Sequence, residues 1–206
     1  GFVGAVITGF LLTAIPNWTG RLPIAGVSLA ALFGLWCAGR LAMAVPSPLG
    51  LPISVAIDAA FLPLLALIAG REVVAGRNWK NLKILAGVSA LAGANIAFHL
   101  AVIFNGDAMM TSRLGTAIYV LLVSVIAGRI VPSFTRNWLV KRGVGTVPAP
   151  FDRIDMAAIV SLAVALLAWV IAPEGIATAI LLLPALGLNT YRLLRWQGHR
   201  TLDEPL

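Results

Sequence analysis

The stretch Ile154–Ala172, IDMAAIVSLAVALLAWVIA, carries a single charged residue, Asp155, near its start. It is rich in alanine and leucine and lacks the alternation of polar and apolar residues that marks the strands of a membrane barrel. A helix rises about 1.5 Å per residue, so a run of this length can cross a hydrocarbon core about 30 Å thick. The stretch therefore predicts a transmembrane α-helix.

The whole chain has the composition expected of such helices. Of its 206 residues, 60% are hydrophobic and 11% are charged, whereas soluble globular domains have about 45–50% apolar and about 25% charged residues. A single water-soluble core of this size cannot bury the excess, and only helices and closed barrels can cross lipid. We therefore expect an all-α fold, a polytopic transmembrane helix bundle embedded in the lipid bilayer.

Proline, glycine and charged residues divide the sequence into about seven membrane segments. These are Gly1–Ile15, Pro23–Ala44, Pro52–Gly70, Leu82–Phe104, Leu114–Val131, Ile154–Ala172 and Gly175–Tyr191. Pro23 and Pro52 stand where the first helical turn tolerates proline, because that position needs no N–H. The longest connection, from Pro132 to Arg153, is basic and rich in proline and glycine. We expect residues 1–206 to form one transmembrane domain.

Basic residues are distributed unevenly between the two ends of these segments. Only Arg40 and Arg113 fall on the side where the first segment begins, and the other 13 of the 15 Lys and Arg residues fall on the opposite side. Short loops rich in Lys and Arg stay in the cytoplasm, so we place Gly1 toward the outside and Leu206 in the cytoplasm. The same bias explains the formal net charge of +7. Because no basic face is interleaved with aromatic residues, we expect no nucleic-acid partner.

Three ionisable residues lie inside the expected spans, where such groups are costly and usually functional. Arg40, Asp58 and His99 come from three different segments, yet all three fall in the outer third of the membrane. Asn95, one helical turn before His99, shares its face. One interpretation is a structural ion pair between Arg40 and Asp58. The other is a polar chamber open to the outside, in which Arg40 binds an anion such as a haem propionate and His99 ligates a metal.

Residues with soft donor atoms show the same bias toward the outside. Cys37, Met43, His99, Met109 and Met110 all map there. Thioether, thiolate and imidazole together suit copper, and imidazole alone suits haem iron, although Met and Cys are also ordinary packing residues. The sequence has no zinc spacing, P-loop, Rossmann glycine pattern or nucleophile elbow. It therefore predicts no catalytic residue of a soluble-enzyme type.

Two short stretches repeat one pattern, aliphatic-Pro-polar-aromatic-Thr. Ile15–Thr19 (IPNWT) is expected to end the first helix, and Val131–Thr135 (VPSFT) is expected to end the fifth. Both fall at a cytoplasmic helix end, which indicates an internal repeat.

The same stretches resemble a known family. Residues 9–20, 39–42 and 128–139, together with the tail at 191–196 and 204–206, are similar to signature stretches of the NnrS family, and the likeness covers most of the chain. The motif residues are Pro16, Asn17, Trp18, Thr19, Arg129, Pro132, Phe134 and Thr135. NnrS proteins are bacterial inner-membrane proteins of about twelve helices, linked to denitrification and nitric oxide stress and described as containing haem and copper.

The resemblance implies a haem- and copper-binding protein of the bacterial inner membrane, with its Gly1 end periplasmic, that acts in the response to nitric oxide or in tolerance of it. Its cofactor-binding candidates are then Arg40, Asp58, Asn95 and His99, with His99 as the metal ligand. The family has a His-x-His-Glu-Met stretch just before the position of Gly1 and further histidines after Leu206. We therefore expect the chain to be a central fragment whose main cofactor ligands lie outside it.

Two other functions use the same residues. A transporter or permease would use Arg40, Asp58 and His99 as a buried pathway, and prolines within spans and a repeat are typical of transporters. In a plain scaffold, Arg40 and Asp58 would only neutralise each other. The sequence does not decide between an enzyme, a transporter and a sensor.

Overall fold

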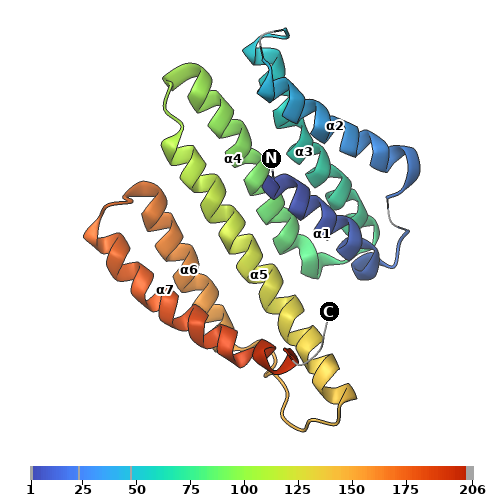
Figure 1. Cartoon of the computed structure of the whole chain (residues 1–206), viewed down its shortest axis with the longest axis vertical. Coiled ribbons are helices and arrows are strands. Elements are labelled where there is room, and N and C mark those ends of the chain that lie inside the picture. The colour runs from blue at the N-terminus through green and yellow to red at the C-terminus, as the bar shows by residue number, and fades with distance from the viewer. Residues whose placement is uncertain (1, 23, 47, 203–206) are drawn as a thin grey trace. The chain divides into compact units, whose positions relative to one another are not determined.

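A computed structural model describes residues 2–22, 24–46 and 48–202, and in this part of the chain every regular element is a helix, with no strand (Figure 1). The helices are α1 (Phe2–Thr19), α2 (Gly26–Ala44), α3 (Leu51–Ala75), α4 (Leu82–Asn105), α5 (Met109–Lys141), α6 (Arg153–Ile171) and α7 (Ile176–Arg195), with short 3₁₀ helices η1 (Trp79–Asn81) and η2 (Gly198–Thr201). Six of these helices are long and apolar enough to cross a membrane, and α1 is a shorter apolar helix. The prediction of a polytopic helical membrane protein is confirmed.

The chain forms two compact units, residues 1–115 and residues 116–206. The first holds α1 to α4 and the start of α5, and the second holds the rest of α5 with α6 and α7. One domain over the whole chain stays a prediction.

In the first unit, α3 is the central helix. It packs against α1, α2 and α4, and its buried stripe includes Asp58, Phe61, Leu65 and Ala69. Gly50 precedes α3 at φ 77°, a conformation that glycine adopts at little cost. Pro52 lies in the first turn, as predicted, where its missing N–H leaves no hydrogen bond unmade.

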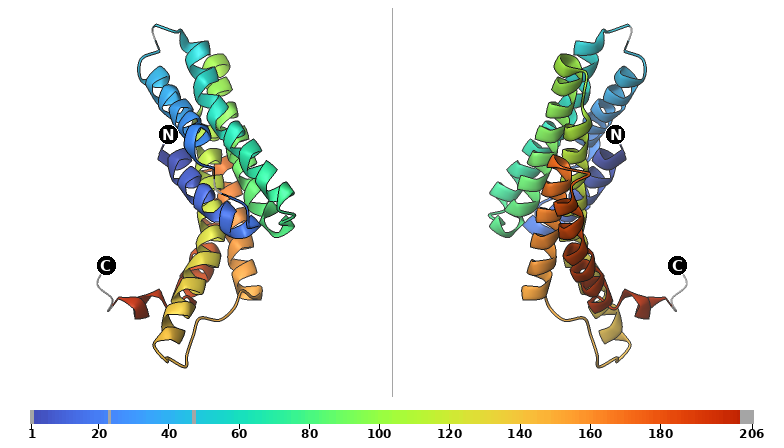
Figure 2. Two further views of the ribbon diagram at one scale, coloured as in Figure 1. Left: turned by 90° about the vertical axis from the view of Figure 1, so that its right-hand side faces the viewer. Right: turned by 90° about the vertical axis from the view of Figure 1, so that its left-hand side faces the viewer.

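In the second unit, α6 and α7 form a packed hairpin. The connection from α5 to α6, residues 142–152, appears at the foot of both views of Figure 2. Two arginines fasten it: Arg136 donates to the carbonyl of Pro148 at 2.6 Å, and Arg200 donates to the carbonyl of Thr146 at 3.0 Å. The connection is therefore tied both to α5 and to η2.

Several predicted boundaries are wrong. Helix α1 continues through Pro16 to Thr19, and α5 continues through Pro132 to Lys141, so residues 132–141 are helix rather than connection. Proline is tolerated inside membrane helices because neighbouring groups can satisfy the carbonyl that it frees. Helix α2 begins at Gly26, and Pro23 lies outside the described residues.

Candidate functional site

The side chain of Asp58 lies at a close contact between two helices. Asp58 is buried on α3, and it faces Gly39 of α2. A Cβ placed on Gly39 would lie 3.1 Å from Cα and 3.1 Å from Oδ1 of Asp58. The missing side chain of Gly39 therefore lets α2 approach α3 where the carboxylate lies.

Asp58 binds two partners from two different helices. Its Oδ1 forms an ion pair with Arg40 of α2, and its Oδ2 lies 2.9 Å from Nε2 of His99 of α4. The side chains of Asp58 and His99 are only 6% and 5% exposed. The ion pair expected between Arg40 and Asp58 is present, and the hydrogen bond from His99 to the same carboxylate is an addition that the sequence did not predict.

This geometry fixes what the His99 ring can do. A neutral imidazole donates from one nitrogen and accepts at the other, so donation from Nε2 to Asp58 leaves Nδ1 as the basic nitrogen. A carboxylate that accepts from one imidazole nitrogen orients the ring and makes the other nitrogen a better metal ligand. His99 can therefore act as a ligand or as a proton acceptor through Nδ1.

Other polar atoms near this level are buried without a hydrogen-bond partner. Within the described residues they are Nε of Arg40, Oγ of Ser54 and Oδ1 of Asn95. Ser54 lies one turn before Asp58 on α3, and Asn95 lies one turn before His99 on α4. Because α3 and α4 are joined by a short connection and run in opposite directions (Figure 1), Ser54 and Asn95 lie on opposite sides of the Asp58–His99 pair. Buried donors and acceptors are usually satisfied, so each of these atoms needs an explanation.

The described residues do not assemble a metal centre of their own. No group of three or more His, Cys, Asp and Glu side chains within them could hold an ion. Met109 and Met110 are 63% and 56% exposed, and Cys37 is partly buried. These residues fit one imidazole ligand with its carboxylate partner, and they do not supply a complete copper site.

The motif residues of α1 lie at the other end of the first unit, away from Asp58. Thr19 packs against Gly76, where an added Cβ would come within 2.6 Å of Cβ of Thr19. Asn78 donates from its side-chain amide to the carbonyl of Trp18, and Arg21 donates to Glu72 at 2.5 Å. These contacts fasten the end of α1 to the end of α3.

The other motif residues occupy separate places. Asn17 donates from its side chain to the carbonyl of Thr13, four residues earlier in α1. On α5, Thr135 is buried while Phe134 is exposed, and Arg129 directly follows Gly128 in sequence. Within the first unit, the structure does not bring the described motif residues of α1 to Asp58 and His99, and the motif residues of α5 belong to the second unit.

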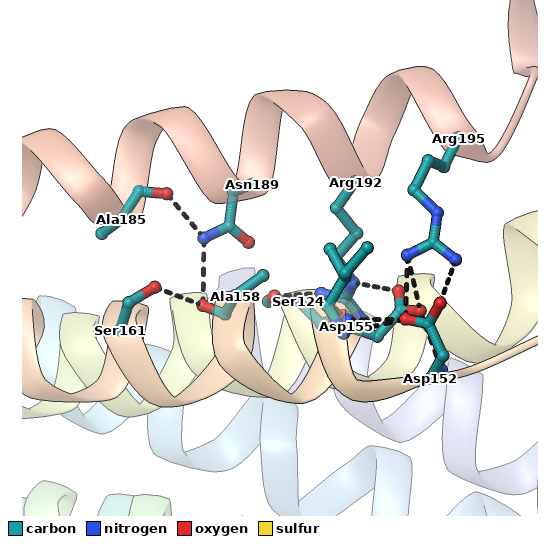
Figure 3. Close-up of polar contacts among 10 residues, drawn as sticks. Ser124, Asp152, Asp155, Ala158, Ser161, Ala185, Asn189, Arg192 and Arg195 are labelled. Atoms are coloured by element: carbon teal, nitrogen blue, oxygen red, sulfur yellow. Dashed lines mark hydrogen bonds and ion pairs between the residues drawn. The ribbon is translucent and has the colours of Figure 1, made fainter.

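The second unit contains a charged cluster that the sequence analysis missed (Figure 3). Arg192 of α7 is 1% exposed, and it donates from Nε to Oδ1 of Asp155 at 2.9 Å and from Nη1 to Oγ of Ser124 at 2.9 Å. Gly128 of α5 leaves room for the guanidinium, because a Cβ there would overlap it. Trp196 lies against the guanidinium, with its ring centroid 5.1 Å away. Arg192 therefore links α5, α6 and α7 through one buried side chain.

A second arginine extends this cluster to the start of α6. Arg195 donates to both carboxylate oxygens of Asp152, at 2.9 and 2.5 Å. Asp152 also caps α6 by accepting from the N–H groups of Ile154 and Asp155, and Asp155 accepts in return from the N–H of Asp152. The hydrogen bonds from Arg195, with those two backbone N–H groups, hold the pKa of Asp152 well below its usual range.

One signal in the sequence could have found this cluster. Asp155 and Arg192 have opposite charges and stand at neighbouring ends of two consecutive apolar segments. Antiparallel helices bring such ends together, and a charge within a span usually has a partner. When Arg192 is counted only among the basic residues of the cytoplasmic side, its pairing with Asp155 is not considered.

The comparison with protein families identifies the chain. The family model described as NnrS protein matches residues 1–206. The chain belongs to the NnrS family. The comparison of this NnrS chain with the curated proteins found no match, and the comparison with solved structures found none. The resemblance seen in the sequence is thus confirmed, and the membrane-spanning helices agree with it.

Proposed function

We propose that this NnrS chain is a multi-pass protein of the bacterial inner membrane that acts in the response to nitric oxide through a haem or copper centre, and that His99 is a ligand of that centre. The observation that carries the proposal is the 2.9 Å contact between Nε2 of His99 and Oδ2 of Asp58, buried inside a span. Such a pair is the usual support of a metal-binding imidazole.

The residues of the chain have separate tasks in this proposal. Asp58 accepts the Nε2 proton of His99 in a hydrogen bond and thereby holds Nδ1 as the free basic nitrogen. Arg40 balances the negative charge of the carboxylate by forming an ion pair with it. A haem iron or a copper ion, when bound, supplies a coordination position for a small ligand such as nitric oxide. The remaining ligands of a copper ion would come from residues other than those described.

We place the site on the periplasmic side of the membrane. Arg40 and His99 lie near the ends of α2 and α4, and Asp58 lies near the start of α3, so the three belong to the end of the first unit that carries few basic residues. The ends of α1 and α3 and the start of α4 hold Arg21, Arg71, Arg77, Lys80 and Lys83. Because loops rich in Lys and Arg stay in the cytoplasm, the opposite end is the periplasmic one.

The first experiment measures haem and copper in the purified full-length protein and in two variants. His99→Leu removes the ligand, and Asp58→Asn removes the carboxylate charge while leaving a hydrogen-bond acceptor. His199→Leu is the matched control, because His199 is exposed in η2. We expect His99→Leu to lose cofactor, Asp58→Asn to lose part of it, and His199→Leu to match the wild type. Unchanged haem and copper in His99→Leu would refute the proposal.

A second candidate function is proton-coupled transport. It is favoured by one observation, a buried carboxylate inside a span that is shared between an arginine and a histidine, because such groups are typical of proton relays. Uptake of solute into proteoliposomes that survives removal of haem and metal would favour transport, and uptake that requires a bound cofactor would count against it.

A further inference from the structure

The ends of α2 and α6 share one backbone geometry. Each helix has 19 residues, and each ends in a C-cap with almost the same dihedral angles: φ −134° and ψ 74° at Val45, and φ −134° and ψ 73° at Ala172. Each cap donates its N–H to the carbonyl four residues earlier. In each case the next residue is a proline, Pro46 or Pro173, and a glycine precedes the following helix.

The ends of α3 and α7 share a second, rarer geometry. Arg77 and Gln197 are the non-glycine residues at positive φ in the described part of the chain, with φ of 49° and 53°. Each is the second residue after its helix. The 3₁₀ helix η1 follows Arg77 after one further residue, and η2 follows Gln197 directly. The left-handed region is costly for residues other than glycine. A positive φ at the second residue after the helix in both units therefore indicates that the ends of α3 and α7 follow one shared pattern.

The buried faces of α3 and α7 agree with this correspondence. Gln197 lies 120 positions after Arg77 (197 − 77), and the same offset pairs Asp58 with Thr178 and Leu65 with Ala185. All four of these residues are buried on their helices. The offset therefore pairs two of the three buried residues of α7 with buried residues of α3.

The first helix of each unit adds a third correspondence. Pro16 in α1 and Pro132 in α5 both lie inside their helices, and each begins the Pro-polar-aromatic-Thr pattern. The two helices differ in length beyond the pattern, because α1 ends at Thr19 and α5 continues to Lys141. Across the units, the three correspondences occur in the same order along the chain.

We infer that α1 to α3 with η1, and α5 to α7 with η2, are two copies of one helical element. We also infer that the Arg40–Asp58 pair, which His99 of α4 contacts from outside the copy, is an addition to the first copy that the element does not need in order to fold. At the position of Asp58, the second copy has Thr178, whose hydroxyl donates to the carbonyl of Ala172 at 2.7 Å. At the position of Arg40, counted back from the matching C-caps, it has Leu167. Neither residue is ionisable.

The charged cluster of the second copy is likewise particular to that copy. The same alignments pair Asp155 with Ser28 and Arg192 with Glu72, and Glu72 instead forms its ion pair with Arg21. Each copy therefore carries its own polar cluster, and the two clusters lie at opposite ends of their hairpins. A polar group that one copy carries and the other replaces is not a requirement of the shared fold.

This inference deepens the proposed function, because charges that the fold does not need are available for binding chemistry. The step that assigns the charges of Arg40 and Asp58 to binding rests on the proposed function. The inference also argues against the plain scaffold as the explanation of Arg40 and Asp58. The folding test compares the wild type and the variants after haem and metal have been removed from all of them, so that the loss of a stabilising cofactor does not affect the comparison. The two proposals can therefore fail separately.

The test gives the first copy the residues of the second at positions 40 and 58, and it also removes the partner of Asp58 on α4. In the full-length protein, Arg40→Leu and Asp58→Thr are combined with His99→Leu, so that no buried donor loses its acceptor. Purified in detergent, this triple variant should remain monodisperse and melt within about 4 °C of the wild type. Asp58→Thr alone should melt well below both, because it leaves Arg40 and His99 without their carboxylate. A triple variant that aggregates, or that melts as low as the single variant, would overturn the inference.

A second measurement tests the repeat itself at the two positive-φ residues. Arg77→Gly and Gln197→Gly each relieve a left-handed conformation. Both should therefore raise the melting temperature, and opposite shifts would contradict a shared geometry.

Haem and copper measured in the triple variant then separate the two proposals. Loss of cofactor from a folded triple variant supports both, and full retention refutes the proposed function alone.

Discussion

Gly39 and Asp58 meet so closely that a Cβ on Gly39 would lie 3.1 Å from Oδ1 of the carboxylate. The packing of α2 on α3 and the position of the buried charge therefore depend on the same glycine. A larger residue at position 39 must push the two helices apart or displace the carboxylate from Arg40 and His99.

We expect Gly39→Val to lower the free energy of unfolding by about 1–3 kcal/mol, the usual cost of overpacking, and to weaken cofactor retention together with stability. Thermal unfolding in detergent measures the first effect. Gly34→Ala on the same helix is the control, because an added Cβ at Gly34 meets nothing within 4 Å. That control should be neutral or slightly stabilising, since alanine favours helix more than glycine does. Equal melting temperatures for Gly39→Val and the wild type would show that the close contact is not needed.

In the second unit, Gly128 has the same relation to Arg192. A Cβ on Gly128 would overlap the guanidinium and lie 3.3 Å from Cζ2 of Trp196. Arg192 cannot move away freely, because Asp155 and Ser124 hold it. We expect Gly128→Ala to destabilise the protein by about 1–3 kcal/mol.

The control for that prediction is Gly115→Ala, also on α5, where an added Cβ meets nothing within 4 Å. Thermal unfolding of both variants should show a loss for Gly128→Ala only. Similar behaviour of the two variants would mean that Arg192 can be displaced at little cost.

Asp152 predicts an acid-sensitive contribution to stability. Its pKa in the folded protein is held below the ordinary value, chiefly by hydrogen bonds from Arg195. A lowered pKa contributes stability that is complete above the pKa of the unfolded chain and disappears as the pH falls toward the folded value. We expect the melting temperature to fall as the pH is lowered below about 4, and we expect Asp152→Asn to reduce this fall.

Asp107→Asn provides the comparison for Asp152→Asn. Asp107 accepts a hydrogen bond from the N–H of Met109 at the start of α5. If Asp107→Asn reduces the acid-induced fall in melting temperature as much as Asp152→Asn does, the hydrogen bonds between Asp152 and Arg195 are not the particular cause of that fall.

The sequence was a good guide to the membrane helices because apolar length is a local property. The predicted segments Ile154–Ala172 and Leu82–Phe104 agree with α6 and α4 to within one residue at each end. The sequence misplaces the ends of α1 and α5, because a proline near a helix end predicts a stop, whereas Pro16 and Pro132 lie inside helices. The effect of a proline depends on neighbouring helices that can satisfy the freed carbonyl, and a single sequence does not show those neighbours.

The residues of the candidate site can be predicted from the sequence, but the contacts between them are harder to predict. Arg40, Asp58 and His99 could be chosen because charges within spans are rare, and the topology placed them at one depth. Asp58 contacts both Arg40 and His99 only when α2, α3 and α4 are rotated suitably about their axes. Tertiary packing at Gly39 sets that rotation. Arg192 was missed because it stands at the end of a span, where an arginine is commonplace.

The central claim is that His99 ligates a cofactor that meets nitric oxide, and one measurement tests it most directly. Optical spectra of the reduced full-length protein are recorded with and without nitric oxide, for the wild type and for His99→Leu. We expect a haem band in the wild type that shifts with nitric oxide, and a changed or missing band in the variant. A wild-type protein with neither haem nor copper, or a variant with the same band and the same shift, would contradict the claim.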